Sequence, residues 1–162
     1  MNNVKRVIGV DPGLNNTGFG ILDYKGSKIK VVAYGLITPP SNESIPNRLE
    51  YLNSHMNDLI DKFNPMYMAI EDSFYSQNVK SAILLGQARG VLLLSAASRG
   101  TLSTIYAPRK VKQSVTGSGS SSKQQVKYMV EKILDIEKKI SSFDITDALA
   151  IGICHINQNK YI

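Results

Sequence analysis

The sequence predicts an α/β fold: a mixed five-stranded sheet flanked by helices. Three strand-like runs open the chain, a helical pattern then alternates with two more short apolar runs, and helical patterns close it. This order makes the first three strands antiparallel and the first, fourth and fifth strands parallel. At 162 residues, 43% of them hydrophobic, the chain has the length of one domain, and we expect a single domain over residues 1–162.

The first half supplies three strands and a helix. A β-branched apolar run predicts a strand over Val4–Val10, which stops at an Asp-Pro-Gly turn. Strands follow over Gly18–Tyr24 and Lys28–Ile37, joined by a Lys-Gly-Ser connection that suits a hairpin. Apolar residues then recur at helical spacing over Ile45–Phe63.

The second half alternates strands with helices. We predict strands over Met66–Ile70 and Thr101–Ala107, and helices over Val79–Arg99, Lys123–Leu134 and Ile145–Gln158. Lys112–Ser122 ends in a Gly- and Ser-rich stretch without apolar periodicity and is expected to be a flexible loop. Gly86 and Gly90, four residues apart, indicate close packing of the second helix against a neighbour.

The charge distribution points to a polyanionic partner. The net charge is +6, and between Asp72 and Glu131 the chain has eight basic residues and no acidic one. A solvated basic face is the alternative interpretation. No segment has the roughly 18 apolar residues of a membrane span, and none resembles a signal peptide. Cys154 is the single cysteine, so we expect a cytoplasmic protein without intrachain disulfides or membrane association.

Four carboxylates occur where secondary structure would position them. Asp11 ends the first strand and Glu71 the fourth, and the carboxyl ends of parallel strands share one edge of a sheet. Asp144 and Asp147 lie on one face at the start of the last helix. If that helix packs nearby, the acids converge and cannot all stay ionised without a cation. Oxygen ligands favour Mg²⁺ or Mn²⁺ over zinc, and two such ions could activate a water for phosphodiester hydrolysis.

Structural roles remain open for the same residues. Asp11 could serve only the turn, Asp144 could cap the last helix, and Asp147 could favour the dipole at its N-terminus. His155 is interpreted as a helix-face residue that could approach the site from two turns beyond Asp147. His55 is expected on the surface, and Cys154 is expected to be a small buried apolar residue.

Four segments in order resemble a known family: VIGVDPGLNNTGFGIL, AIEDSFYSQNVKSAILLGQARG, YAPRKVKQSVTGSGSSSKQQVKYMV and FDITDALAIGICH. They are similar to the motifs of the bacterial RuvC-type Holliday-junction resolvases. The resemblance implies an RNase H-like fold and a homodimer. It also implies an endonuclease that uses Mg²⁺ or Mn²⁺ to nick four-way DNA junctions symmetrically during recombination and repair, with a branch-migration motor of RuvA and RuvB type as a partner.

The resemblance also assigns roles to residues. The metal-binding acids of the family match Asp11, Glu71, Asp144 and Asp147, and Lys123 joins them as a catalytic residue. The residues expected to bind DNA are Phe74, Tyr75, Asn78, Arg89, Lys112 and Lys123, of which Phe74 matches the aromatic residue that probes the junction. An aromatic side chain there could stack on an unpaired base.

Three other functions fit parts of the sequence. The Asp-Pro-Gly turn followed by Thr17 and Gly18 is similar to the phosphate-binding hairpin of actin-like ATPases, but those proteins need two lobes and this chain is too short for both. An RNA nuclease of YqgF type would share the first turn and a late acid. A non-catalytic DNA-binding subunit would keep the basic residues and need none of the four acids.

Overall fold

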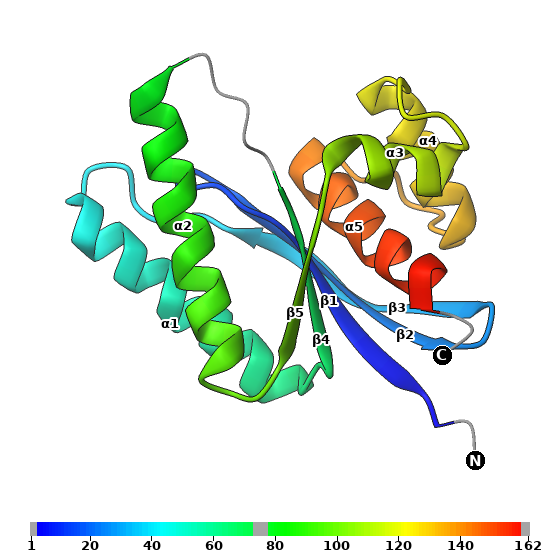
Figure 1. The fold of residues 1–162 in the computed structure, drawn as a ribbon, viewed down its shortest axis with the longest axis horizontal. Coiled ribbons are helices and arrows are strands. Elements are labelled where there is room, and N and C mark those ends of the chain that lie inside the picture. Colours follow the sequence, from blue (N-terminus) through cyan, green and yellow to red (C-terminus); the bar gives the residue numbers. More distant parts are fainter. Residues whose placement is uncertain (1–2, 73–77, 160–162) are drawn as a thin grey trace.

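The computed structural model describes residues 3–72 and 78–159, which form one mixed sheet with helices on both faces (Figure 1). The strand order is β3-β2-β1-β4-β5. The strands are β1 (Lys5–Asp11), β2 (Thr17–Lys25), β3 (Lys28–Ile37), β4 (Tyr67–Glu71) and β5 (Leu102–Tyr106). β1, β2 and β3 pair antiparallel, whereas β4 pairs parallel with both β1 and β5. This arrangement confirms the predicted fold class.

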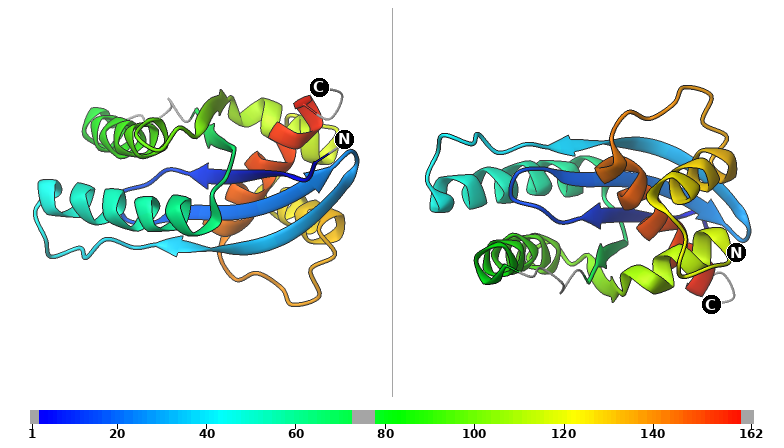
Figure 2. Two further views of the ribbon diagram at one scale, coloured as in Figure 1. Left: turned by 90° about the horizontal axis from the view of Figure 1, so that it is seen from below. Right: turned by 90° about the horizontal axis from the view of Figure 1, so that it is seen from above.

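Two helical layers cover the sheet. The helices are α1 (Ile45–Phe63), α2 (Val79–Ala97), α3 (Pro108–Thr116), α4 (Lys123–Ile133) and α5 (Phe143–Asn159). α1 and α2 pack together on one face, and α5 crosses the other face against β1 and β2 with α3 and α4 outside it (Figures 1 and 2). Each layer therefore buries one face of the sheet.

The alternation of side chains along β1 and β4 decides which layer each residue meets. Val7 and Ala69 belong to the core under α5, whereas Ile8 and Ile70 belong to the core under α1 and α2. Because side chains alternate between faces, odd-numbered positions of both strands face α5. The acids that end β1 and β4 have the same parity and are therefore delivered to the α5 side.

Glycines allow α5 to lie directly on the sheet. A Cβ atom at Gly9 would collide with the backbone of Ala148, and one at Gly18 with the carbonyl oxygen of Asp144. Glycine within a strand is typical of such close backbone approach. The contact at Gly18 places the first turn of α5 beside the start of β2.

The predicted loop Lys112–Ser122 is wrong over its first part, because residues 108–116 form α3. Pro108 occupies the first helical turn, where its missing N–H costs nothing, and Val111 and Val115 are buried one turn apart. The pattern is too short for periodicity to reveal the helix from sequence. α3 ends at Gly117, whose φ of 84° lies in the left-handed region that glycine favours.

The packing role predicted for Gly86 and Gly90 is wrong for residues 3–72 and 78–159, where nothing lies within 4 Å of a Cβ atom built at either position. The buried side of α2 instead includes Ala88 and Leu92, and both glycines lie on its other side. In the described part of the chain, α2 alone has the length and apolar composition of a membrane span. Core helices of soluble proteins pass the same test, so this is weak grounds for a membrane role.

Candidate active site

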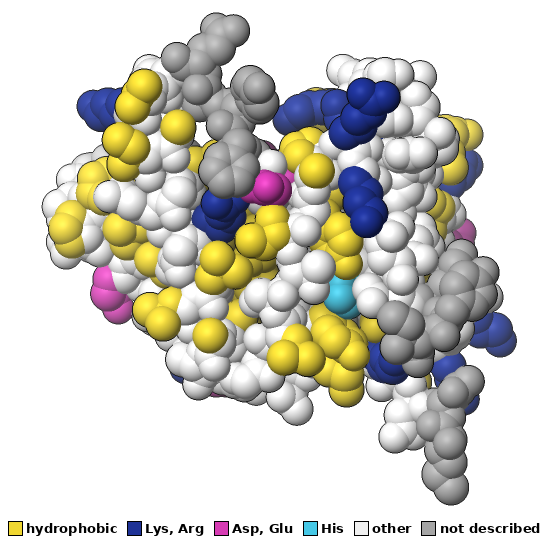
Figure 3. All heavy atoms as spheres, in the orientation of Figure 1, with side chains coloured by type: hydrophobic (Ala, Val, Ile, Leu, Met, Phe, Trp, Pro, Cys, Tyr) yellow, Lys and Arg dark blue, Asp and Glu magenta, His cyan; other side chains and the backbone are white. Residues whose placement is uncertain are grey.

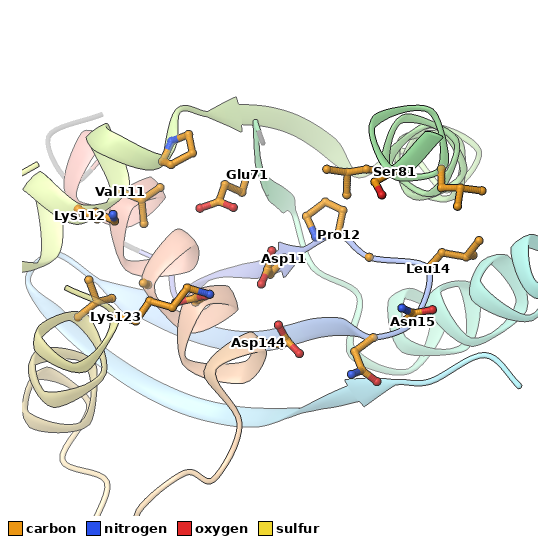
Figure 4. A pocket seen from close by; sticks show the side chains of 18 of the residues that line it. Asp11, Pro12, Leu14, Asn15, Glu71, Ser81, Val111, Lys112, Lys123 and Asp144 are labelled. Carbon is orange, nitrogen blue, oxygen red and sulfur yellow. The ribbon is translucent and has the colours of Figure 1, made fainter. Parts of the chain in front are cut away.

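Four carboxylates from three elements line one cleft of about 630 Å³ (Figure 4). Val10 of β1 pairs with Ile70 of β4, so the next residues, Asp11 and Glu71, leave the sheet side by side. α5 contributes Asp144 and Asp147 to the same cleft. The convergence expected from the strand ends and the last helix is therefore present in the structure.

Asp144 lies inside the first turn of α5, which begins at Phe143. Its alternative role as the helix cap is therefore wrong. Asp147 follows it by three positions, so the two side chains occupy one side of the helix. Figure 4 shows Asp144 directed into the cleft near Asp11.

Burial and mutual repulsion make the acids hard to ionise together. The pKa of Asp11 rises to about 8, first because the carboxyl is buried and then because Glu71, Asp147 and Asp144 are close. Burial also raises the pKa of Glu71, and the charge of Asp147 raises it further. The pKa of Asp147 is raised by burial and by the charge of Asp144. Raised pKa values of several acids in one cleft are typical of functional sites.

Two lysines supply part of the compensating charge. Nζ of Lys123, the first residue of α4, lies 3.5 Å from Oδ2 of Asp147. Lys112 of α3 lines the same cleft, and both lysines lower the pKa values of Glu71 and Asp147. Figure 4 places Lys112 and Lys123 at one end of the cleft, with Asp11 and Asp144 near its middle.

The donor set fits a hard divalent cation. All four candidate ligands are carboxylates, and oxygen ligands are what Mg²⁺ and Mn²⁺ prefer. Within residues 3–72 and 78–159, no three His, Cys, Asp or Glu side chains form a ready-made ion site. Glu71 and Asp144 point into different parts of the cleft in Figure 4, so binding an ion requires side chains to turn toward one point.

Two further predicted DNA-binding residues flank the cleft without lining it. Asn78 is the N-cap of α2, where its side chain accepts a hydrogen bond from the Lys80 N–H at 3.0 Å. Arg89 donates to Asp72 at 2.6 Å, beside Glu71. The predicted contacts of Phe74 and Tyr75 fall on residues outside the described ranges.

The prediction that His155 could approach the acids is wrong. His155 is buried, and its Nδ1 lies 2.9 Å from the Tyr106 hydroxyl, on the sheet side of α5. Burial lowers its pKa to about 4, so the ring is neutral at physiological pH. His55 is exposed and Cys154 is buried, as predicted.

Sequence reasoning missed residues that shape the turn after β1. The buried Thr17 hydroxyl donates to the Gly13 carbonyl at 2.6 Å, and Arg48 of α1 donates to the Leu14 carbonyl at 3.0 Å. Gly18 and Gly20 lie on one face of β2 and could have predicted the close approach of α5, because alternate glycines on one strand face indicate that another backbone lies against it. Nothing local marked Arg48, whose partners lie more than thirty residues away.

The family model described as "Crossover junction endodeoxyribonuclease RuvC" matches residues 7–155. The chain belongs to the RuvC family. RuvC relatives from Dictyoglomus thermophilum and Alkaliphilus oremlandii are 43% and 41% identical, over 95% and 96% of this chain and 98% and 94% of theirs. Membership identifies the chain as a nuclease and sets aside the actin-like ATPase and the non-catalytic subunit.

Solved structures agree with the RuvC assignment. The structure of T. thermophilus RuvC in complex with a Holliday junction substrate has a TM-score of 0.92 and 27% identity, covering 97% of this chain and 96% of that chain. The yeast mitochondrial Holliday junction resolvase Ydc2 has a TM-score of 0.69 at 16% identity, covering 94% of this chain and 79% of that one. Ydc2 supports the fold alone, which is RNase H-like as the resemblance implied.

Proposed function

We propose that this chain resolves four-way DNA junctions by hydrolysing one phosphodiester in each of two symmetric strands. The observation that carries the proposal is the convergence of four carboxylates beside Lys112 and Lys123 in one cleft of a RuvC-family chain. Asp11, Glu71, Asp144 and Asp147 are proposed as metal ligands, with two Mg²⁺ ions per site and Mn²⁺ as a substitute. A pair of bound ions would activate the attacking water and stabilise the leaving oxygen.

The ionisation of Asp11 and the charge of Lys123 would both affect metal binding and catalysis. Asp11 must lose a proton before it can act as a ligand, because its pKa near 8 keeps much of it protonated at neutral pH without a cation. Lys123 favours that ionisation, since its charge lowers the pKa of Asp11. The same ammonium group would offset negative charge that develops on the scissile phosphate.

The basic residues form a rim along which DNA can approach. Figure 3 shows Lys and Arg side chains along the part of the surface formed by α3, next to a hollow that holds an acidic side chain. α3 contributes Arg109, Lys110 and Lys112, and α4 contributes Lys123 and Lys127. Phosphate contacts from such a rim supply affinity without sequence preference.

A homodimer is proposed from the outer side of α2. Exposed apolar residues repeat there at helical spacing with two glycines whose added Cβ would meet nothing within 4 Å in the described ranges: Val79, Ile83, Gly86, Gly90 and Leu94. The edge strand β5 adds exposed Leu102 and Ile105. An exposed apolar surface of this kind marks an interface, and a second copy related by a two-fold axis would supply the second active site for the second strand.

The ends of segment 73–77 are tied to the fold. The Asp72 N–H donates to the Tyr106 carbonyl at 2.8 Å, its carboxylate pairs with Arg89, and Asn78 begins α2 at the other end. We propose, from the family resemblance, that Phe74 stacks on a base at the junction and that Tyr75, Asn78 and Arg89 contact DNA nearby.

The family resemblance also supports two proposals about the cell. We propose that the protein acts in the cytoplasm and cooperates with a branch-migration motor of RuvA and RuvB type. Co-purification of the junction-bound chain with those motor subunits tests the second.

A cleavage assay tests the proposed function directly. A labelled four-way junction and a matching linear duplex are incubated with the protein in Mg²⁺, Mn²⁺ or EDTA. We expect paired nicks in the junction alone, and only with metal. Cutting of RNA instead would favour the YqgF-type alternative, and binding without cutting in every metal would contradict catalysis.

A further inference from the structure

Arg48 is a buried cation without an ionic partner. The residue is 9% exposed, and it is the only Lys, Arg, Asp or Glu buried in the described ranges. None of the four ion pairs found there includes it. Burying a guanidinium is costly unless the charge is paired, so this position calls for an anion or a functional reason.

The guanidinium uses only part of its donor capacity. Nη2 donates to the Leu14 carbonyl at 3.0 Å and to Oδ1 of Asn15 at 2.7 Å, while Nε is buried with no hydrogen-bond partner in the described part of the chain. Oδ1 of Asn16 accepts a hydrogen bond from the Thr38 hydroxyl at 3.2 Å. Both asparagines thus use their amide oxygens as acceptors within the chain, which leaves their amide NH2 groups as candidate donors to a ligand.

These residues line the same cleft as the acids. Arg48, Asn15 and Asn16 share it with Asp11 and Glu71. In Figure 4, Asn15 lies on the side of Asp11 opposite Lys112 and Lys123. The cleft is therefore basic at both ends and acidic in its middle.

This charge order matches a single nucleic-acid strand whose scissile phosphate lies over the acids. The cleft, at about 630 Å³, falls within the size range of ligand pockets and exceeds what one phosphate group needs. A planar guanidinium recognises phosphate oxygens through parallel donors, which a carbonyl and one amide oxygen do not exhaust.

We propose that Arg48, with the side-chain amides of Asn15 and Asn16, binds a non-scissile phosphate of the strand being cut, on the side of the scissile phosphate opposite Lys112 and Lys123. The inference rests on the proposed function. It makes Arg48 a binding residue that sets the register of the strand over the acids, in addition to holding the turn after β1.

The test neutralises one phosphate at a time. Junctions carry a single methylphosphonate linkage at successive positions on each side of the scissile bond, and affinity is measured in EDTA. We expect one position on one side to lower the affinity of the unaltered protein about tenfold, the loss typical of one charged hydrogen-bonded contact. Arg48→Gln should lower affinity for the unmodified junction by a similar factor and be insensitive to that same linkage.

Control variants separate binding from structure. Lys112→Gln should lose sensitivity to a linkage on the other side of the scissile bond and keep it at the Arg48 position. Asn16→Asp, at an exposed position, adds repulsion without altering Arg48 and should lower affinity at the same phosphate even if Arg48→Gln does not fold. Thermal unfolding reports whether each variant is folded.

The outcomes are distinct. The inference is overturned if Arg48→Gln and each methylphosphonate linkage lower junction affinity independently, so that the combined loss equals the product of the two separate losses. Arg48 would then only anchor the turn. A protein that binds junctions with this coupling but cuts nothing in Mg²⁺ would refute the proposed function while leaving the phosphate contact in place.

Discussion

Nζ of Lys123 and Oδ2 of Asp147 lie 3.5 Å apart and connect the first turn of α4 with α5 across the cleft. The two partners differ in environment, with the lysine side chain 62% exposed and the aspartate 19%. The pair therefore adds little to stability, because an exposed lysine is well solvated. Its consequence is electrostatic, since Lys123 lowers the pKa values of Asp11, Glu71 and Asp147.

Lys123→Gln should slow junction cutting by about ten- to a hundredfold, because charge near the scissile phosphate is lost. It should also shift the rising limb of the pH–rate profile toward higher pH, since the acids become harder to ionise. Single-turnover rates across pH measure both effects. Lys127→Gln, one turn along the same helix and outside the cleft lining, is the matched control and should leave the profile in place.

Asp11→Asn and Glu71→Gln should each reduce cutting by about a thousandfold or more, because each removes a metal ligand. Junction affinity in EDTA should change little, since the basic rim is intact. Gel-shift and cleavage assays on the same preparation compare the two. Loss of binding in both variants would show that the acids hold the fold rather than the metal.

Without metal, the contribution of Asp11 to stability should fall as pH rises from about 4 toward 8, opposite in sign to that of buried His155, whose lowered pKa acts below about pH 6.5. The pKa of Asp11 is about 8 in the folded chain and near 4 when unfolded, so in this window the unfolded state binds fewer protons. Asp11→Asn removes that cost and should raise the free energy of unfolding at pH 8 by about 1 kcal/mol or more, or roughly 2 to 4 °C in Tm. Calorimetry in EDTA at pH 5 and pH 8 measures it, and an equal effect at both values would contradict the assignment.

Ile83→Glu should convert the proposed dimer to a monomer, because it places a charge in the middle of the apolar side of α2. Sedimentation at micromolar concentration reports the mass, and paired nicking of a junction should become uncoupled single nicking. Val4→Glu, at another exposed apolar position, should leave the dimer unchanged. A monomeric mass for the unaltered protein would refute the interface.

Phe74→Ala should weaken cutting of junctions more than binding to them, because stacking at the junction centre aligns the strands rather than supplying charge. Phe74→Tyr keeps an aromatic ring and should restore cutting. Equal losses of binding and cutting in the alanine variant would return Phe74 to a structural role.

Much of the site was predictable from local pattern. Asp11 and Glu71 stand at the ends of apolar runs, and parallel strands bring their carboxyl ends together. Asp144 and Asp147 carry the three-residue spacing of one helix face. These features depend on neighbours along the chain, which periodicity records.

Two features depended on residues distant in sequence. α3 is nine residues long and gains its stability by burying Val111 and Val115 against α5, so its own pattern was too short to reveal it. His155 turns toward Tyr106, 49 residues away, rather than toward the acids. The helical position of a residue specifies its direction only after the packing angle of α5 is known.

By itself, the sequence determined the order and type of most elements, the strand-end acids and the membership of the family. The tertiary structure alone decided how closely α5 approaches the sheet at Gly9 and Gly18, which acids share one cleft, and that Arg48 lies at its far end. The physical reason is the separation along the chain of the residues that interact. Secondary structure follows from hydrogen bonds and side-chain periodicity between near neighbours, whereas burial and pKa shifts arise from contacts that only the packed chain creates.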